Sequence, residues 1–533
     1  MTQAILATTS MTVTFSSEEA KAMVATSHAP RQNFPKVPVF KDPKINNRDQ
    51  NAMKLFTSLE AKNAKMALPK ALIKGIAVAK KAQHRLDIKA QTNFTQMDFW
   101  LAGKNQNIVT EKGATIHILQ PKDGTFVANF GNFKESQLAL HKGTIESPQG
   151  HLVLANPAGF MFEDGSKVDV SRLTVLVGGD IKVDEKNNIS MKKITRPESV
   201  FINRGEINIT DAGLSSFVAP HMAHFGKIIA AKGNVQLRAG VVAVDLHGDG
   251  NILIEAKEVD LEAAEKLAQE NLGEKGLYLL SGSDALDLIR KAANTGAQAT
   301  HARVEGGDII IGAPVVQVKK TDIVAKKEQE GGRVKIEGKF IHVDQNSTID
   351  ASGKNTAGRI LIGGDFQGNL EKHAFKGEPG KLAPHSDFTI AKENNAHKVI
   401  VEEGAKITAT GSETGGQLVI WSGQNSNDAS ITYMNATADL SSSLGQGGAF
   451  EVSSKGRVIL PTGTLQLDTK GPLGQGLRLI DPAHLIFAAD ATTAAIANAP
   501  WSGTTAVLDQ NSGNSLTSGS SPYSLSHSTP HFL

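Results

Sequence analysis

The sequence contains no cysteine among its 533 residues, which excludes disulfide bonds, thiol catalysis and cysteine-based zinc sites. Aromatic residues are scarce, at 5% of the chain. No apolar run reaches the roughly 18 residues that a membrane-spanning helix needs, so the sequence predicts no such helix. The net charge is only +2. A nucleic-acid-binding domain is usually strongly basic, so we expect no nucleic-acid partner.

Glycine is abundant instead, with 51 residues, and hydrophobic residues make up 40% of the chain. A glycine followed by alternating apolar residues recurs at 306–311, 332–336, 358–362, 416–420 and 448–452. Earlier glycines, Gly205, Gly226 and Gly248, are spaced by 21 and 22 residues. Short strands joined by tight turns at a period of about 20 residues are typical of a β-helix rung.

Side chains alternate between the two faces of a strand, so the apolar positions of these repeats are expected to form the core. The residues predicted to point inward are Leu152, Leu154, Val235, Leu237, Ile360, Ile362, Leu418 and Ile420. The sequence therefore predicts an all-β fold, a right-handed parallel β-helix with a short helical insertion.

The predicted organisation has five segments. Residues 1–93 form a basic leader, irregular or partly helical, since 15 Lys and Arg stand against 6 Asp and Glu through Lys89. Residues 94–256 form a first β-helix domain and 300–485 continue its rungs. Residues 257–299 form the helical insertion, with Asp260 as an N-cap. Residues 486–533 form a low-complexity tail.

A break between two apolar runs carries the strongest motif. Asn156, Pro157 and Gly159 separate Leu154 from Phe160, and a turn and the alternating strand 168–170 follow. This pattern resembles the amino-terminal two-partner-secretion (haemagglutination activity) domain of filamentous haemagglutinin-like exoproteins. That family usually has Asn at the position of Ala158. The segments 97–100, 114–121 and 127–129 are similar to its opening rungs, and the similarity extends over roughly 94–485.

The resemblance implies an adhesin-like exoprotein that is secreted or held at the cell surface, outside the outer membrane. An outer-membrane β-barrel transporter of the two-partner type would export it. The resemblance also implies a receptor or glycan on a host or neighbouring cell as a ligand. Asn156, Pro157 and Gly159 would form the secretion motif. The first residues of the chain lack the basic and apolar regions of a clear signal peptide.

Two alternative functions remain open. One is the amino-terminal fragment of a contact-dependent toxin, which requires a separate catalytic domain. The other is a carbohydrate-active β-helix enzyme, which requires clustered carboxylates. The candidates for such a cluster are Asp245, Asp249 and Glu255, with His247. We interpret them as a polar turn, and we expect no enzyme activity and no cofactor.

Two further sets of polar residues are candidate sites. His221 and His224 have a spacing that binds metal on a helix, but we expect a loop there and hence no metal site. Asn203, Asn208, Thr210 and Asn234 are candidates for ladders of like side chains on successive rungs, with a structural role.

Overall fold

The structure is a computed structural model. It describes residues 69–81, 84–99, 108–130, 138–247, 251–256, 258–295, 301–368, 388–423, 429–461, 466–474, 476–488 and 507–509.

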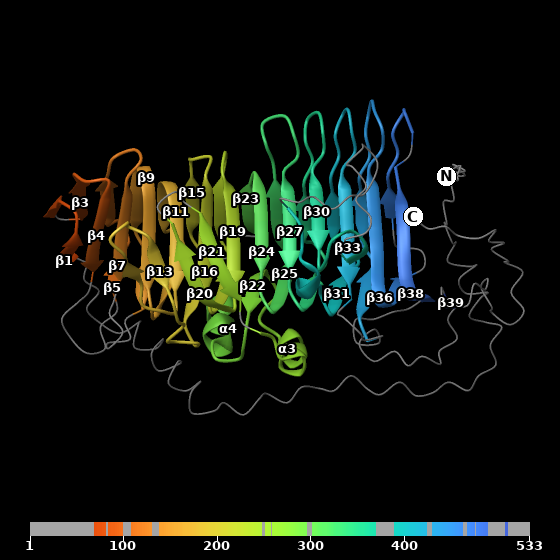
Figure 1. The fold of residues 1–533 in the computed structure, drawn as a ribbon, viewed down its shortest axis with the longest axis horizontal. Helices are drawn as coiled ribbons and strands as arrows, with labels where there is room; N and C mark the ends of the chain where they lie inside the picture. The colour runs from red at the N-terminus through yellow and green to blue at the C-terminus, as the bar shows by residue number, and fades with distance from the viewer. Residues whose placement is uncertain are drawn as a thin grey trace, which may run out of the picture.

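The chain folds into a parallel β-helix, in which short strands lie side by side along one long axis (Figure 1). Each rung contributes strands to three faces. The first face consists of β3 (Arg85–Ala90), β6 (Thr115–Leu119), the first parts of β9 (Thr144–Asn156) and β11 (Lys167–Val177), β15 (Glu206–Ile209), β18 (Lys227–Ala230), β23 (Ala302–Gly306), β26 (Thr321–Ala325), β29 (Thr348–Asp350), β32 (Lys406–Thr408), β35 (Thr437–Asp439) and β37 (Gln466–Asp468).

The second face follows the first on each rung. It consists of β4 (Phe94–Phe99), β7 (Thr125–Phe130), the second parts of β9 and β11, β16 (Leu214–Ala219), β19 (Asn234–Ala239), β24 (Asp308–Gly312), β27 (Arg333–Glu337), β30 (Arg359–Ile362), β33 (Gln417–Ser422) and the first parts of β36 (Ala449–Pro461) and β38 (Arg478–Ala488).

The third face completes the rung. It consists of β5 (Ile108–Thr110), β8 (Ala139–His141), β10 (Gly159–Phe162), β14 (Val200–Asn203), β17 (His221–His224), β22 (Gly276–Leu280), β25 (Val315–Lys319), β28 (Phe340–Val343), β31 (Lys398–Val401), β34 (Ile431–Met434) and the second parts of β36 and β38, against which β39 (Val507–Asp509) pairs antiparallel.

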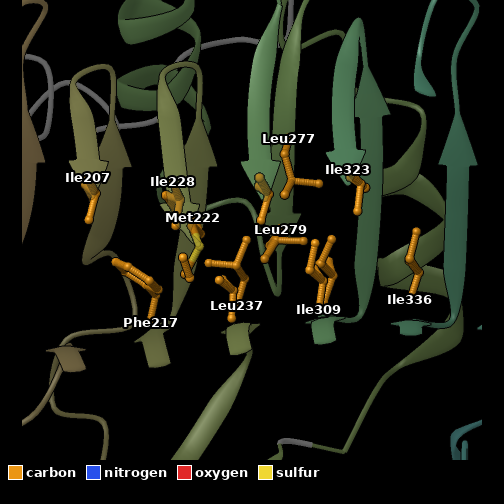
Figure 2. Close-up of a cluster of buried hydrophobic side chains, with 14 of the residues drawn as sticks. Ile207, Phe217, Met222, Ile228, Leu237, Leu277, Leu279, Ile309, Ile323 and Ile336 are labelled. Carbon is orange, nitrogen blue, oxygen red and sulfur yellow. The ribbon is translucent and has the colours of Figure 1, made fainter. Parts of the chain in front are cut away.

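The core runs continuously through the interior of the solenoid, where apolar side chains from the faces meet (Figure 2). The inward prediction is confirmed for every residue of the set, since each of these side chains is buried: Leu152, Leu154, Val235, Leu237, Ile360, Ile362, Leu418 and Ile420. Alternation of apolar and polar residues therefore identified the core, because one face of each strand is sealed from water.

Glycines recur at two corners of the rung. Gly205 and Gly226 precede the first-face strands β15 and β18, at the corner between the third and first faces. The glycines of the later repeats, from Gly306 to Gly448, lie where the chain turns from the first face onto the second. At this corner the backbones of successive rungs approach closely. A Cβ placed on Gly358 would overlap the carbonyl oxygen of Gly332, and one on Gly476 would overlap that of Gly448. The repeat thus requires glycine for close backbone approach.

Two outer layers cover apolar residues that point away from the core. An antiparallel sheet of β12 (Lys182–Val183), β13 (Ile189–Met191), β20 (Val241–Leu246) and β21 (Ile252–Ala256) packs on the second face. Helices α3 (Leu261–Ala268) and α4 (Leu286–Asn294) pack on the third face. Two single 3₁₀ turns are η1 (Phe366–Gly368) and η2 (Lys392–Asn394).

The predicted boundary at 93 and 94 is wrong. Strands β1 (Pro69–Lys74) and β2 (Ala77–Lys81) precede it, and β3 pairs in parallel with β6 as part of the first rung. The strand pattern was missed because β2 lies at the end of the stack and none of its side chains is buried. Residues 1–68, where the rest of the leader was predicted, lie outside the described residues.

The insertion at 257–299 is only partly helical. Asp260 caps α3 as expected, since its side chain accepts hydrogen bonds from the backbone N–H groups of Glu262 and Ala263. Between the helices, however, β22 returns to the third face and pairs antiparallel with β17 and β25. The solenoid also continues past 485, because β38 ends at Ala488 and β39 lies within the predicted tail.

Candidate recognition site

The Asn156–Gly159 turn joins the second face to the third, where β9 ends and β10 begins. The side-chain oxygen of Asn156 accepts the backbone N–H of Ala158 at 2.9 Å. Its side-chain nitrogen donates to the carbonyl oxygen of Gly159 at 2.8 Å. Asn156 therefore closes an Asx turn, and the partners of these two hydrogen bonds lie within three residues of it.

Most of the turn is buried in the folded solenoid. Asn156 is fully buried, Pro157 and Gly159 are buried, and only Ala158 is partly exposed. Gly159 has a φ of +122°, and a Cβ there would lie 2.6 Å from the carbonyl oxygen of Val200. A residue with a side chain is thus excluded at this position by both backbone conformation and space.

Ser199 holds the turn from the next rung. Its hydroxyl donates to the carbonyl oxygen of Pro157 at 2.6 Å, and the Ser199 side chain is buried. Nothing local in the sequence marks Ser199, which lies 42 residues after Pro157. The carbonyl group that Pro157 exposes at the corner is thereby satisfied inside the fold.

A second Asx turn occurs at the corner between the third and first faces. The side-chain oxygen of Asn203 accepts the backbone N–H of Gly205 at 3.1 Å, and Asn203 is fully buried. Its side-chain nitrogen lies 3.1 Å from Nδ1 of His224 and 3.3 Å from the carbonyl oxygen of Lys227. The two asparagines therefore share chemistry and burial but occupy different corners.

The predicted loop at His221 and His224 is wrong, because both belong to strand β17. Residues three apart on a strand point to opposite faces and cannot bind one ion together. Nε2 of His224 lies 3.0 Å from the carbonyl oxygen of Arg303, and Nδ1 of His221 accepts the backbone N–H of Ser281 at 3.3 Å. Burial lowers the pKa of His224 to about 4. Both imidazoles serve as hydrogen-bonding groups between elements.

Two of the carboxylates considered for catalysis, Asp245 and Glu255, lie on adjacent strands of the outer sheet and on the same face of it. Asp245 lies in β20 and pairs with Lys192 at 2.6 Å, while Glu255 is exposed on β21. His247 follows β20 and is exposed, and Asp249 lies outside the described residues. Across the described ranges, no group of three or more His, Asp or Glu is placed to hold a metal ion.

Two buried carboxylates elsewhere, Asp308 and Glu337, are paired with cations. Asp308 lies 2.7 Å from Arg333 and 3.1 Å from Lys327, and Glu337 pairs with Arg238 and Lys335. Burial raises the pKa of each carboxyl, but these cations outweigh it and hold both pKa values below the ordinary range. Both groups are thus ionised at neutral pH, whereas a general acid needs a raised pKa.

The polar ladder does not form between like residues. Asn208 donates to Asp169 at 2.8 Å on the neighbouring rung, and Asn234 accepts the backbone N–H of Asp308 at 2.8 Å. Thr210 donates to the carbonyl oxygen of Val170 at 3.4 Å. Asn203 faces His224, as described above. The structural role is confirmed, but unlike partners provide it.

Comparison with known proteins finds similarity only among solved structures. No protein-family model and no curated protein matches the sequence. The HMW1 secretion domain from Haemophilus influenzae aligns over 77% of this chain and 99% of its own, at 15% identity and a TM-score of 0.45. A filamentous hemagglutinin secretion domain aligns over 78% and 99%, at 10% identity and a TM-score of 0.30. No helix of the described part is long and apolar enough to cross a membrane.

Proposed function

We propose that the chain is an adhesin-like exoprotein exported by a two-partner system, in which an outer-membrane β-barrel transporter recognises the turn at Asn156, Pro157 and Gly159. The sequence motif and the rungs around it support this function. The observation that carries it is the locality of the turn. The two side-chain hydrogen bonds by which Asn156 closes the turn reach residues no more than three positions away.

A turn of this kind needs no other rung in order to form. Pro157 restricts its own φ, and the Asx hydrogen bond of Asn156 fixes the reversal. In the folded solenoid Asn156 is fully buried, so its side chain offers nothing to a partner. A transporter would therefore read the turn on the unfolded chain, before Ser199 and the following rung cover it.

The solenoid architecture suits export of an unfolded chain. Each rung pairs with its immediate neighbours, so rungs can fold one after another as they emerge. The close backbone approach at the glycine corner then locks each rung onto the previous one. Folding outside the membrane would oppose backward movement of the chain.

The test is secretion by a reconstituted pair. The whole chain, supplied with a working signal peptide, is produced with and without the transporter encoded beside its gene. The proposal predicts that the protein reaches the medium or cell surface only with the transporter. Absence of such a gene, or export that ignores the transporter, would contradict the proposed route. Binding of the exported protein to host or neighbouring cells then tests the adhesin role.

A further inference from the structure

The N-terminal end of the solenoid presents an unusual surface. Strands β1 and β2 close it, pairing antiparallel with β4 and β3. Large apolar side chains that are strongly exposed are rare among the described residues: Ile73, Ile76, Val78, Leu119, Val242, Leu253, Leu444 and Leu473. The first four of these eight lie at this end.

The strand register places two of the four side chains in one row. Val78 of β2 is opposite Lys89 of β3, and Lys89 is opposite Leu119 of β6. Val78 is 58% exposed and Leu119 is 41% exposed, and Lys89 between them is also exposed. Residues opposite each other in a sheet point to the same side, so they form a continuous outward strip.

The other two side chains flank the turn between β1 and β2. Ile73 is 53% exposed and Ile76 is 57% exposed. Gly75 between them has a φ of +87°, and the backbone N–H of Ile76 is held by the Thr92 hydroxyl at 3.0 Å. The side chains of Ile73 and Ile76 are thus exposed to solvent at an ordered turn.

The same segment is strongly basic. Residues 69–91 contain Lys70, Lys74, Lys80, Lys81, Arg85 and Lys89 against a single acidic residue, Asp87. Asp87 already accepts from Arg85 at 2.8 Å and lies 3.0 Å from Nδ1 of His117. Lys80 lies two residues after Val78 and so on the same side of β2, and Lys81 is exposed at the end of that strand. The surface therefore combines protruding aliphatic groups with positive charge.

Lysines on a terminal strand also prevent edge-to-edge pairing of sheets, but this role gives no reason for the exposed isoleucines and valine. A second copy presenting the same end would be repelled by its like charge. Anionic lipid headgroups attract lysines, and the acyl boundary accepts aliphatic side chains. We propose that this end, the cap surface of Ile73, Ile76, Val78, Lys80, Lys81, Lys89 and Leu119, docks onto an anionic lipid surface.

The test is co-sedimentation of the full chain with vesicles of phosphatidylcholine alone or with phosphatidylserine added. Binding is expected only to the anionic vesicles and should weaken as salt is raised. Each lysine near such a surface strengthens binding about fivefold. The charge-reversing pair Lys80→Glu with Lys81→Glu should therefore weaken binding by at least about tenfold. The pair Ile76→Ser with Val78→Ser should weaken it at unchanged charge.

Matched controls are available at other exposed sites. Lys112→Glu with Lys232→Glu reverses the charge of two exposed turn lysines, and Leu444→Ser with Leu473→Ser removes two exposed leucines. Both control pairs should bind vesicles like the unmodified chain, and all variants should keep its thermal midpoint.

Equal binding to both vesicle types, no binding, or cap variants that bind like the controls would each overturn the proposal. Binding to acidic polypeptides but not to vesicles would do so too. The result of the vesicle experiment does not depend on whether a transporter recognises the Asn156 turn.

Discussion

The imidazole of His141 stacks on the ring of Phe162, with 5.1 Å between the ring centroids and 19° between the planes. Phe130 meets the same imidazole edge-on at 5.5 Å. His141 is 1% exposed, and neither of its ring nitrogens has a hydrogen-bond partner among the described residues. Burial lowers the pKa of His141 to about 3. The aromatic core therefore holds this histidine in its neutral form.

Acid should weaken the fold through this residue. In the unfolded chain His141 becomes protonated below its ordinary pKa of about 6.5. In the folded protein it becomes protonated only near pH 3. The free energy of unfolding is thus highest above the pKa that His141 has in the unfolded chain. It falls as the pH drops toward the pKa of His141 in the folded protein. One such histidine costs about 2 kcal/mol of unfolding free energy at pH 5. We expect His141→Leu to reduce the loss between pH 8 and pH 5, measured by denaturant unfolding. Parallel losses in both proteins would contradict this.

Gly358→Ala should destabilise the solenoid strongly. Its Cβ would overlap the carbonyl oxygen of Gly332 on the neighbouring rung, and neither backbone can move without breaking its strand pairing. We expect a loss of at least about 2 kcal/mol, seen as a lower denaturation midpoint. Gly282→Ala is the control, because its Cβ would come no closer than 3.7 Å to another group. Equal effects of the two changes would show that the corner is not tightly packed.

Leu237→Asp should cost several kcal/mol, roughly, because it places an unpaired charge among buried side chains (Figure 2). Gln236→Asp is the matched control. Gln236 is adjacent to Leu237, and its side chain points outward and is partly exposed. Thermal unfolding of both variants gives the comparison. An unchanged midpoint for Leu237→Asp would contradict the inward assignment.

Structural features that depend on a local pattern of residues could be predicted from the sequence. Alternation identified Leu237 as inward, because a strand with one sealed face must alternate. Asn156, Pro157 and Gly159 marked a break between two strands, because a turn of this kind is built from neighbouring residues. The cap at Asp260 was predicted for the same reason.

Features set by distant partners were missed. Ser199 contacts Pro157 across a rung, and β22 is a strand only because β17 and β25 lie on either side of it. Residues 69–81 fell in a leader that was predicted to be irregular or partly helical, since an end strand has little buried face to impose alternation. His221 and His224 were expected in a loop, because the strands that pair with β17 are distant in the sequence.

Recognition of the Asn156 turn is proposed to direct export, and a comparison with Asn203 separates this role from a structural one. Both asparagines are fully buried and close an Asx turn, so Asn156→Ala and Asn203→Ala each leave buried polar groups unpaired, at about 1–3 kcal/mol per group. The measurement is the secreted yield of each variant through the partner transporter, set against the thermal midpoint of the purified protein. We predict that Asn156→Ala lowers secretion well below that of Asn203→Ala at a comparable midpoint. Secretion that simply follows the midpoint in both variants would contradict the claim and leave the turn with a structural role alone.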